Sequence, residues 1–440
     1  MSAPASRTPE EWLAAAIAHE AKGAVPEAYQ AYRKAVEGFK AQGRQDEARQ
    51  ADRRCANLEI AELTASMEEH RAMRLFKDEG RDRQYAEMVM ARKRGALLGL
   101  AVGDALGASV EFVDPGPRPF NRPLPGPMRD MNGGGFFHVK RGQVTDDTQM
   151  ACCIAATLLE TGHLDANNLA KRYLEWRPSA FDVGGTVSRV LELVANGENP
   201  YEAALRDWQA GGRRNAPNGS LMRTAPIALF FNDKRERVIA GVIESMITHA
   251  DPRCVLACVG FNAAVSFLCR FDDLSNSGAP VNALTLGAVR EEMQMGVEYL
   301  KDLRKEDSEY IERASASLES DLMAAQEQDP GLYSSGLDLI KHRGYVRVAF
   351  RLAFWELKHA PSFREGLLDV VNRGGDSDTN GAITGALLGA SYGEDSIPEE
   401  WRSEVMEALQ DGPPGPLRDE YHPKRLLELV DHEQKPREKS

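Results

Sequence analysis

The sequence predicts an all-α protein in which a small helical arm precedes one compact, orthogonal helical domain. Three observations predict this fold. Long segments are rich in helix-forming Ala, Leu, Glu, Gln, Lys and Arg, and they contain almost no alternating β-branched runs of the kind that indicate strands. Glycines also recur at every fourth position in two apolar segments, and residues four apart share one face of a helix.

The first 90 residues predict two or three antiparallel helices, which form the arm. Gly23 and Gly43 mark helix ends, and Pro26 is placed to open the second helix. Small and aromatic residues within the arm resemble the second half of a tetratricopeptide repeat; they are Gly23, Glu27, Ala28, Tyr32 and Ala35. Two interpretations stay open, a helical cap or oligomerisation arm for the main domain and a module that binds a protein partner.

The main domain is predicted over residues 91–430, and a charged tail follows over residues 431–440. Its two glycine ladders are Gly95, Gly99, Gly103 and Gly107, and Gly381, Gly385 and Gly389. Glycine inside a helix costs about 0.5–1 kcal/mol relative to alanine, so the ladders imply a packing demand that outweighs helix propensity. We expect these two helices to lie centrally and to pack against one another.

A segment dense in proline and glycine, Asp114–Gly142, predicts a long surface loop. Loops of this length inside a compact domain are often lids or binding loops, and an ordered connector is the alternative. The position of the loop between Glu111 and the pair Asp146 and Asp147 favours a lid. The break at Asp272–Val281 and the C-terminal tail are typical of solvated segments without chemistry.

Composition and charge disfavour several classes of function. The net charge of −13 and the pI near 5.3 disfavour nonspecific binding to nucleic acid or to anionic membranes. The first residues lack the apolar core of a signal peptide. The most apolar stretch, Gly95–Phe112, carries Asp104 in its middle, so we expect no membrane span.

The cysteines indicate a reducing compartment. Their spacing fits neither a zinc site nor a secreted disulfide scaffold. The six positions are Cys55, Cys152, Cys153, Cys254, Cys258 and Cys269. We expect buried thiols in a cytoplasmic protein.

The first of two aspartate clusters consists of Asp146 and Asp147 after Thr145, which can cap a helix. That helix is expected to run to about Thr161, where Gly162 ends it. Taken alone, this cluster is typical of plain helix capping, because the helix macrodipole stabilises negative charge at the N-terminus.

The second cluster, Asp376 and Asp378, precedes Thr379 and a helix expected from Asn380 to about Ala390. Two separate helix starts therefore carry carboxylates together with threonine hydroxyls. Four converging carboxylates would repel one another unless cations neutralised them, and oxygen ligands select hard ions such as Mg²⁺ or Mn²⁺ over zinc. The sequence thus predicts a two-metal site with ions about 3.5–4 Å apart.

The motifs around these clusters resemble, in order, those of the ADP-ribosylglycohydrolases. They are Arg94–Gly107 with Glu111-Phe112, Gly142–Met150, Asp182–Thr186, Asn218–Pro226, Thr248–Pro252 and Gly374–Ile383. Together they cover roughly Arg94–Gly393. The resemblance implies an all-α, metal-dependent hydrolase that removes ADP-ribose from modified protein side chains.

The resemblance also implies a role for each motif residue. Two Mg²⁺ ions, or Mn²⁺, would be held by Thr145, Asp146, Asp147, Asp376, Asp378 and Thr379. The catalytic residues would be Glu111, Asp146, Asp147 and Asp376, with the identity of the general base open. The substrate contacts would be Asp182, Gly184, Gly185, Asn218, Gly219, Ser220 and His249. The ions would hold the vicinal hydroxyls of the distal ribose during hydrolysis at its anomeric carbon.

Simpler interpretations exist for residues outside the aspartate clusters. Glu111 could be a surface carboxylate at a helix end, and Asp182 could form an Asx turn. The pair Asn218-Gly219 is usually a turn, and a lone histidine such as His249 is more often structural. For Glu111, the family resemblance favours the functional role.

The expected partner is an ADP-ribosylated protein substrate. Arginine linkage is favoured over serine or acetyl linkage, because Asp182 and the run Gly375–Thr379 look closer to the arginine-cleaving branch. The alternatives are a catalytically silent protein that binds ADP-ribose or neutralises a toxin, and a scaffold derivative of the fold. Intact aspartate clusters argue against lost catalysis. Asn380 and the helical arm depart from the commonest pattern and leave the substrate open.

Overall fold

The computed structural model divides the chain into two compact units, residues 1–80 and 81–440. The described residues are 7–22, 25–44, 47–48, 51, 54, 83–120, 126, 128–271, 281–412, 415–416 and 419–432. Apart from loops and one hairpin of two-residue strands, β1 (Asp411–Gly412) and β2 (Gly415–Pro416), these residues are helical. The predicted all-α class is confirmed. The predicted boundary at residue 90 falls inside the helix Arg83–Ala108.

The described residues of the smaller unit include two helices that pack against each other, α1 (Pro9–Glu20) and α2 (Val25–Ala41). A capping box opens α1. The hydroxyl of Thr8 accepts from the amide of Glu11 (3.2 Å), and the carboxylate of Glu11 accepts from the amide of Thr8 (2.8 Å). This reciprocal pair satisfies two backbone donors that a helix start otherwise leaves open.

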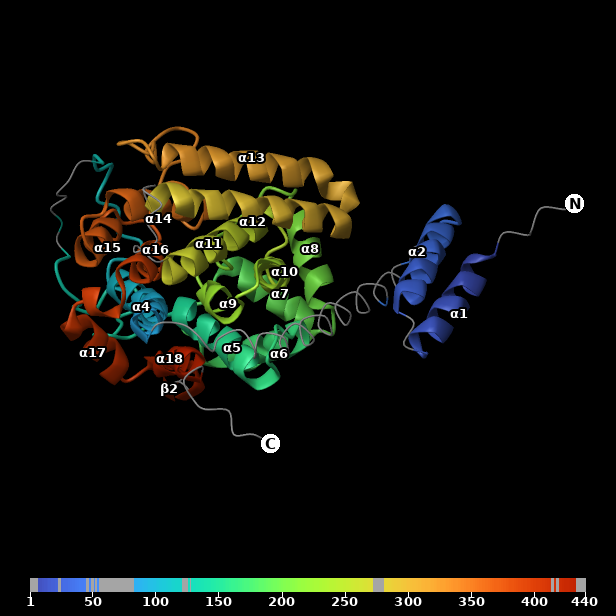
Figure 1. Ribbon diagram of the computed structural model, residues 1–440, viewed down its shortest axis with the longest axis horizontal. Helices are drawn as coiled ribbons and strands as arrows, with labels where there is room; N and C mark the ends of the chain where they lie inside the picture. Colours follow the sequence, from blue (N-terminus) through green and yellow to red (C-terminus); the bar gives the residue numbers. More distant parts are fainter. Residues whose placement is uncertain are drawn as a thin grey trace, which may run out of the picture. The chain divides into compact units, whose positions relative to one another are not determined.

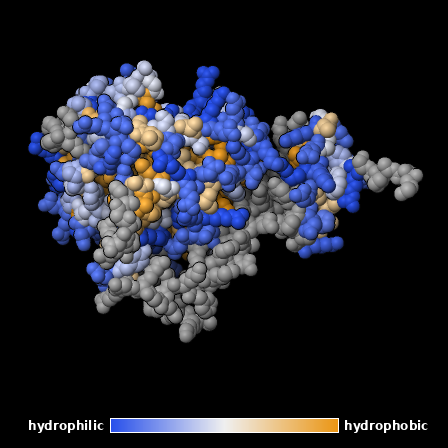
Figure 2. Space-filling model, turned by 45° about the horizontal axis from the view of Figure 1, so that its top comes forward, coloured by the Kyte–Doolittle hydropathy of each residue, from blue (hydrophilic) through white to orange (hydrophobic). Residues whose placement is uncertain are grey.

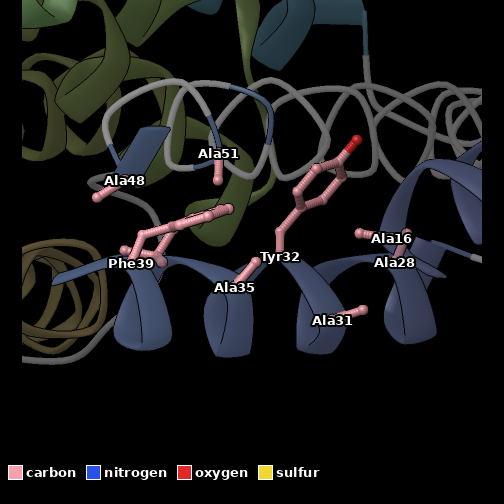
Figure 3. Close-up of a cluster of buried hydrophobic side chains, with 9 residues drawn as sticks. Ala16, Ala28, Ala31, Tyr32, Ala35, Phe39, Ala48 and Ala51 are labelled. Carbon is pink, nitrogen blue, oxygen red and sulfur yellow. The ribbon is translucent and has the colours of Figure 1, made fainter. Parts of the chain in front are cut away.

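The described core of the smaller unit consists of alanines and Val36 around two aromatic rings, Tyr32 and Phe39 (Figure 3). Alanine lets helix backbones come close, and the rings fill the remaining space. The hydroxyl of Tyr32 also donates to Glu20 (2.5 Å). Of the residues predicted to resemble a repeat, Ala28, Tyr32 and Ala35 lie in this core. Gly23 lies outside the described residues, and the repeat itself stays a prediction.

The larger unit is built from stacked helices, shown in chain order by colour in Figure 1. They are α4 (Arg83–Ala108), α5 (Asp146–Thr161), α6 (Ala166–Trp176), α7 (Gly185–Ala195), α8 (Pro200–Ala210), α9 (Ala225–Phe230), α10 (Lys234–Met246), α11 (Pro252–Arg270), α12 (Val281–Leu303), α13 (Ser308–Ala324), α14 (Val346–His359), α15 (Phe363–Asn372), α16 (Ser377–Tyr392), α17 (Glu399–Glu407) and α18 (Lys424–Asp431). Short 3-10 turns follow α6, α12 and α16 at Arg177–Ser179, Lys305–Asp307 and Glu394–Ser396, and another, Asp419–Tyr421, precedes α18.

The glycine ladders of α4 and α16 face each other in antiparallel fashion, as predicted. Gly99 lies opposite Gly385, and Gly103 lies opposite Gly381. A Cβ atom at any of these four positions would lie less than 3.0 Å from a backbone oxygen of the facing helix, a distance that real Cβ atoms do not show. Only glycine permits this approach. The C-terminal end of α4 therefore lies beside the N-terminal end of α16.

The helix α11 is the core helix with the most membrane-like composition. Among the described helices, it is the one long and apolar enough to cross a membrane, and 89% of its most apolar window is buried inside the protein. It packs against α10, α12, α13 and α16. The stretch predicted to be the most apolar, Gly95–Phe112, is buried from Gly95 to Ala108, whereas Phe112 at its end is exposed.

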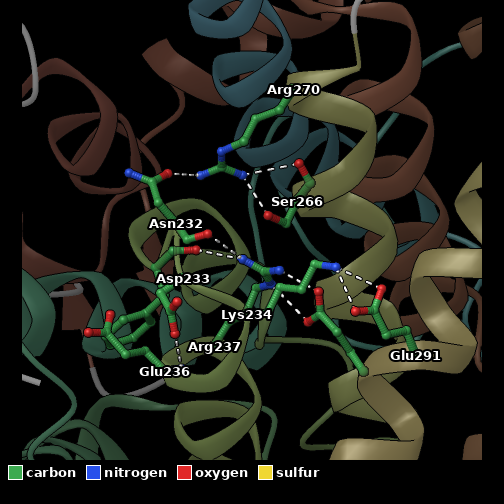
Figure 4. Close-up of polar contacts among 10 residues, drawn as sticks. Asn232, Asp233, Lys234, Glu236, Arg237, Ser266, Arg270 and Glu291 are labelled. Atoms are coloured by element: carbon green, nitrogen blue, oxygen red, sulfur yellow. Dashed lines mark hydrogen bonds and ion pairs between the residues drawn. The ribbon is translucent and has the colours of Figure 1, made fainter. Parts of the chain in front are cut away.

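A polar network joins α10, α11 and α12 (Figure 4). Arg237 of α10 donates to Glu292 of α12 (3.0 Å) and to a backbone carbonyl (2.8 Å). Next to it, Lys234 pairs with Glu291 (2.7 Å). Because the buried pair Arg237–Glu292 has several hydrogen bonds, its desolvation is offset. The network fixes the relative position of these helices.

The face of the protein shown in Figure 2 is mostly hydrophilic, with hydrophobic surface confined to patches. Three exposed apolar side chains adjoin the candidate active site. They are Phe112, Val113 and Phe136, with 42%, 50% and 66% of their surface exposed. Phe112 and Phe136 contact each other, with ring centroids 5.2 Å apart.

We expect Gly103→Ala to destabilise the larger unit by about 1–3 kcal/mol or more, because its Cβ would collide with the carbonyl oxygen of Gly381. Gly287→Ala in α12 is the matched control. A Cβ there meets nothing within 4 Å, and alanine is favoured in a helix by about 0.5–1 kcal/mol. Urea unfolding measures both variants. Equal midpoints for Gly103→Ala and the unsubstituted chain would contradict the close backbone contact.

Candidate active site

Backbone pairing after α4 holds Glu111 beside the second aspartate cluster. The amide of Phe112 donates to the carbonyl of Gly375 (3.0 Å), and the amide of Gly375 donates to the carbonyl of Val113 (3.2 Å). Gly375 has a φ of 78°, which glycine adopts without strain. Since Glu111 precedes Phe112 and Asp376 follows Gly375, this backbone pairing brings Glu111 close to the second aspartate cluster.

Three carboxylates from separate segments converge, those of Glu111, Asp182 and Asp378. One oxygen of each lies within 4.8 Å of an oxygen of the other two. Glu111 and Asp378 are buried, and Asp182 is half-buried. A set of oxygen donors suits a hard divalent cation. The sequence predicts a catalytic role for Glu111, substrate binding for Asp182 and metal binding for Asp378. The geometry permits all three carboxylates to bind one ion.

Asp104 of α4 organises the start of α5. The amide and the hydroxyl of Thr145 donate to Asp104 Oδ1 (2.9 Å each), and the amide of Thr148 donates to Asp104 Oδ2 (3.1 Å). Thr145 occupies the N-cap position, as predicted, but its side chain does not cap α5. The cap comes from Asp104, because a buried carboxylate is a stronger acceptor than a hydroxyl. The predicted helix end at Gly162 is confirmed, with φ 75°.

Sequence analysis noted Asp104 only as a charge in an apolar stretch and gave it no site role. Asp104 is fully buried. Burying a carboxylate is costly unless several donors satisfy it. An aspartate at the centre of a glycine-rich apolar helix therefore indicates that polar groups from another segment donate hydrogen bonds to it. This pattern could have identified Asp104 from the sequence.

The second aspartate cluster lies at the start of α16, which begins at Ser377 and not at the predicted Asn380. Asp378 and Thr379 are therefore inside the first turn. The amide of Thr379 donates to Asp378 Oδ1 (2.8 Å), and the amide of Asn380 donates to the carbonyl of Asp376 (3.0 Å). The predicted helix start at Asn380 was wrong. Aspartate and threonine favour the positions before a helix, but the helix macrodipole also stabilises acidic residues within the first turn.

The site carboxylates repel one another. Burial raises the pKa of Glu111 to about 9, and the charges of Asp182 and Asp376 add to the rise. Burial, with the charge of Asp376 next, raises the pKa of Asp182 to about 7. For the same two kinds of reason, burial first and neighbouring carboxylates second, the pKa lies well above its ordinary value for Asp146, Asp147 and Asp378. The charges of the two predicted aspartate clusters therefore interact within one site.

Two buried carboxylate oxygens of the site have no hydrogen-bond partner among the described residues, Glu111 Oε2 and Asp147 Oδ1. Such atoms in native proteins are satisfied by protein groups, water or ions. The charges that act most strongly on these two groups are other carboxylates. A cation is therefore the partner that the electrostatics favour, and the oxygen donors fit Mg²⁺ or Mn²⁺.

Gly184 and Gly185 begin α7 next to the first aspartate cluster. The amide of Gly184 donates to Asp146 Oδ2 (3.4 Å). A Cβ at Gly184 would meet no atom within 4 Å, and one at Gly185 would meet only Arg189 Nη1, at 3.5 Å. Neither glycine has a left-handed φ. Neither packing nor conformation requires glycine here, so the space above the helix start is open to a ligand.

Asn218 reaches the acidic cluster, whereas Ser220 does not. Asn218 Nδ2 donates to Asp376 Oδ2 (2.7 Å). Ser220 is fully buried, and its hydroxyl accepts from Ser245 Oγ (2.9 Å). The predicted ligand contact through the Ser220 side chain therefore has no support in the geometry, because the hydroxyl faces the core and is already bonded.

His249 lies directly behind Gly219, where a Cβ would be 3.1 Å from two atoms of the imidazole. It is 2% exposed. Burial, followed by the charge of Arg223, lowers the pKa of His249 well below its ordinary value, so the ring is neutral. Its Nδ1 lies 2.7 Å from the hydroxyl of Thr248, and its Nε2 is buried and has no hydrogen-bond partner among the described residues.

Two known proteins are similar to this chain over most of its length. The ADP-ribosyl-[dinitrogen reductase] glycohydrolase of Rhodospirillum rubrum is 31% identical over 319 residues, which are 71% of this chain and 90% of that protein. The ADP-ribosylarginine hydrolase Tri1 of Serratia proteamaculans is 26% identical over 325 residues, which are 72% of this chain and 75% of that protein.

A solved structure and a family model also match this chain. The structure, an ADP-ribosylglycohydrolase-related protein complex, matches with a TM-score of 0.56 and 29% identity over 78% of this chain and 99% of its own. Residues 86–436 match the family model for ADP-ribosylglycohydrolase, a range that begins after the smaller unit. This match spans most of the sequence, and the chain belongs to the ADP-ribosylglycohydrolase family.

Proposed function

We propose that this chain is a metal-dependent hydrolase that releases ADP-ribose from modified protein side chains, with arginine as the preferred acceptor. The observation that carries the proposal is the convergence of Glu111, Asp182 and Asp378 at buried carboxylate oxygens that have no hydrogen-bond partner within the described part of the chain. Membership of the family supports the reaction class. The name of the Serratia relative, an ADP-ribosylarginine hydrolase, supports the choice of arginine.

Two Mg²⁺ ions, or Mn²⁺, are the proposed cofactors. We assign them to the threonine and aspartate oxygens at the two helix starts, which are Thr145, Asp146, Asp147, Asp376, Asp378 and Thr379. Glu111 and Asp182 lie close enough to contribute as well. When bound, such ions would polarise oxygen ligands and lower the pKa of bound water. Cations would also offset the repulsion that raises the pKa of these carboxyls.

The proposed reaction adds water across the bond between the anomeric carbon of the distal ribose and a guanidine nitrogen. The hydroxyl group joins the carbon, and a proton goes to the departing nitrogen. Positive charge develops on the sugar ring in the transition state, and the surrounding carboxylates stabilise it. We assign the proton transfer to Glu111, because its buried Oε2 has no hydrogen-bond partner among the described residues.

We propose that ADP-ribose lies across the start of α7 and the turn at Asn218. Backbone amides at a helix N-terminus favour phosphate, and the open space at Gly184 and Gly185 leaves room for it. Asn218 contacts Asp376 and so links this turn to the acidic cluster. The neutral ring of His249 supports Gly219 from behind, which makes it a positioning residue.

Two further proposals concern the setting of the reaction. The smaller unit has its own core and lies outside the family match, which supports a protein-binding role for residues 1–90. The five described cysteines are buried free thiols, as expected, and we propose a reducing, cytoplasmic compartment. Cys55 lies outside the described residues.

Asp378→Asn should lower the rate of ADP-ribose release from an arginine-modified protein by about a hundredfold or more in Mg²⁺, because it removes one charged ligand. Asp302→Asn, which changes an exposed aspartate on α12, should leave the rate unchanged. Release is measured after chelation and after addition of Mg²⁺ or Mn²⁺. Tight binding of ADP-ribose without release by the unsubstituted chain, with either metal, would contradict hydrolysis and favour a binding protein.

The metal-free chain should lose stability as pH rises. The folded pKa of Glu111 is about 9 against an ordinary 4.5, and that of Asp182 is about 7 against 3.8. Because both are raised, the folded state holds more protons, so their stabilising contribution is fully present below about pH 4 and is lost as pH passes about 7 and then about 9.

Mg²⁺ should therefore raise the melting temperature more at about pH 8.5 than at about pH 5.5. Thermal unfolding with and without the ion measures this difference. In Glu111→Gln the dependence on pH should be weaker, since one raised pKa is gone. A larger effect of Mg²⁺ at the lower pH would contradict the proposed cation site.

Gly184→Val should fold normally, within about 0.5 kcal/mol, and weaken ADP-ribose binding by about tenfold or more, because the new side chain fills the ligand space. Gly336→Val is the control, since a Cβ there also meets nothing within 4 Å. Calorimetric titration with ADP-ribose in Mg²⁺ measures binding. Unchanged affinity in Gly184→Val would show that the ligand does not pass over the start of α7.

A further inference from the structure

Four phenylalanine rings border the acidic cluster and have no part in the proposed reaction. They are Phe112, Phe136, Phe137 and Phe181, called the aromatic rim below. Successive ring centroids lie 5.2, 5.0 and 5.6 Å apart. Two of the rings are direct chain neighbours of site carboxylates, since Phe112 follows Glu111 and Phe181 precedes Asp182. The rim is therefore continuous with the site.

A glycine loop presents two rings of the rim. Gly134 and Val139 pair through two backbone hydrogen bonds (2.7 and 2.9 Å). Gly133, Gly134 and Gly135 have φ values of 67°, 97° and 70°, which glycine alone adopts readily. A Cβ at Gly135 would lie 2.7 Å from the carbonyl oxygen of Ser109, just after α4. The loop is thus closed on itself and packed against the end of α4, next to the acidic cluster.

The rim is open to a ligand. Phe136 is 66% exposed and Phe112 is 42% exposed. Contiguous exposed aromatic rings on a hydrophilic surface mark interaction sites more often than isolated apolar residues do. A group that covers these rings also comes within reach of the site carboxylates. The rim is therefore placed to contact the part of a substrate that lies just beyond the scissile bond.

Arg343 indicates which chemical group suits the rim. Its guanidinium carbon lies 5.6 Å from the centroid of the Phe112 ring. Burial raises the pKa of Asp376, and the charge of Arg343 partly opposes this rise. A guanidinium thus fits between an aromatic ring and the acidic cluster in this protein. Cation–π attraction and the negative field both favour a flat cation over a neutral group.

We propose that the aromatic rim binds the guanidinium of the acceptor arginine and so selects arginine-linked over hydroxyl-linked ADP-ribose. The inference rests on the proposed hydrolysis and names the residues that determine its substrate class. A glycosylated guanidine remains flat and cationic, so it can stack on a ring. A serine linkage offers neither property. Phe136 is the main contact, because it is the most exposed ring and Arg343 lies over Phe112.

The first test compares substitutions of Phe136 on two peptides of one sequence, ADP-ribosylated on arginine or on serine. Phe136→Leu keeps an apolar side chain and removes the ring. It should lower kcat/KM for the arginine peptide by about three- to tenfold, through KM, and change kcat/KM for the serine peptide by less than about twofold. Phe136→Tyr should restore the arginine value. Phe267→Leu, outside the rim on α11, should leave both values unchanged. An equal fall on both peptides would overturn the proposal.

The second test does not depend on turnover. Ligand-observed NMR compares an arginine peptide with its citrulline counterpart, which has nearly the same shape without the charge. The arginine peptide should bind more tightly, and Phe136→Leu should remove that difference. Equal binding of both peptides would overturn the proposal that the aromatic rim binds the guanidinium. If the chain releases ADP-ribose from neither substrate, the hydrolase proposal fails, and this binding difference still decides the rim by itself.

Discussion

The backbones of α4 and α16 touch along their glycines, and this contact determines where the charged residues of the site can lie. Because the two helices run antiparallel, the end of α4 meets the start of α16. Asp104 and Glu111 come from the first segment, and Asp376 and Asp378 come from the second. A side chain larger than hydrogen at the contact would separate the helices. The carboxylates of the two segments would then no longer share one space.

The second constraint is electrostatic. Buried carboxylates are costly unless donors or cations satisfy them. Asp104 meets this requirement with donors from α5, and it therefore acts as a structural acceptor. Glu111 and Asp147 keep oxygens without a partner among the described residues. The same acidic surroundings thus contain a satisfied group, which holds a helix in place, and unsatisfied groups, which are available to a cation and a substrate.

In the proposed function, chemistry and recognition occupy neighbouring but distinct surfaces around these carboxylates. The start of α7 is open at its two glycines, and the turn at Asn218 is bonded to Asp376, so the ADP-ribose side has a polar boundary. The aromatic rim forms an apolar boundary that begins directly after Glu111. In the proposed function, this division would allow related chains to change their acceptor through the rim without altering the acidic groups that we assign to hydrolysis.

The sequence by itself determined the helical class, the packing of the glycine ladders and the aspartates at two helix starts, since periodicity and capping depend on neighbours a few residues away. Tertiary structure decided the rest. Asp104 rather than Thr145 caps α5, Ser220 turns into the core, and Phe136 meets Phe112. Each outcome depends on which distant segment supplies a partner, and local pattern cannot specify that, because burial and donor geometry arise only when the helices pack.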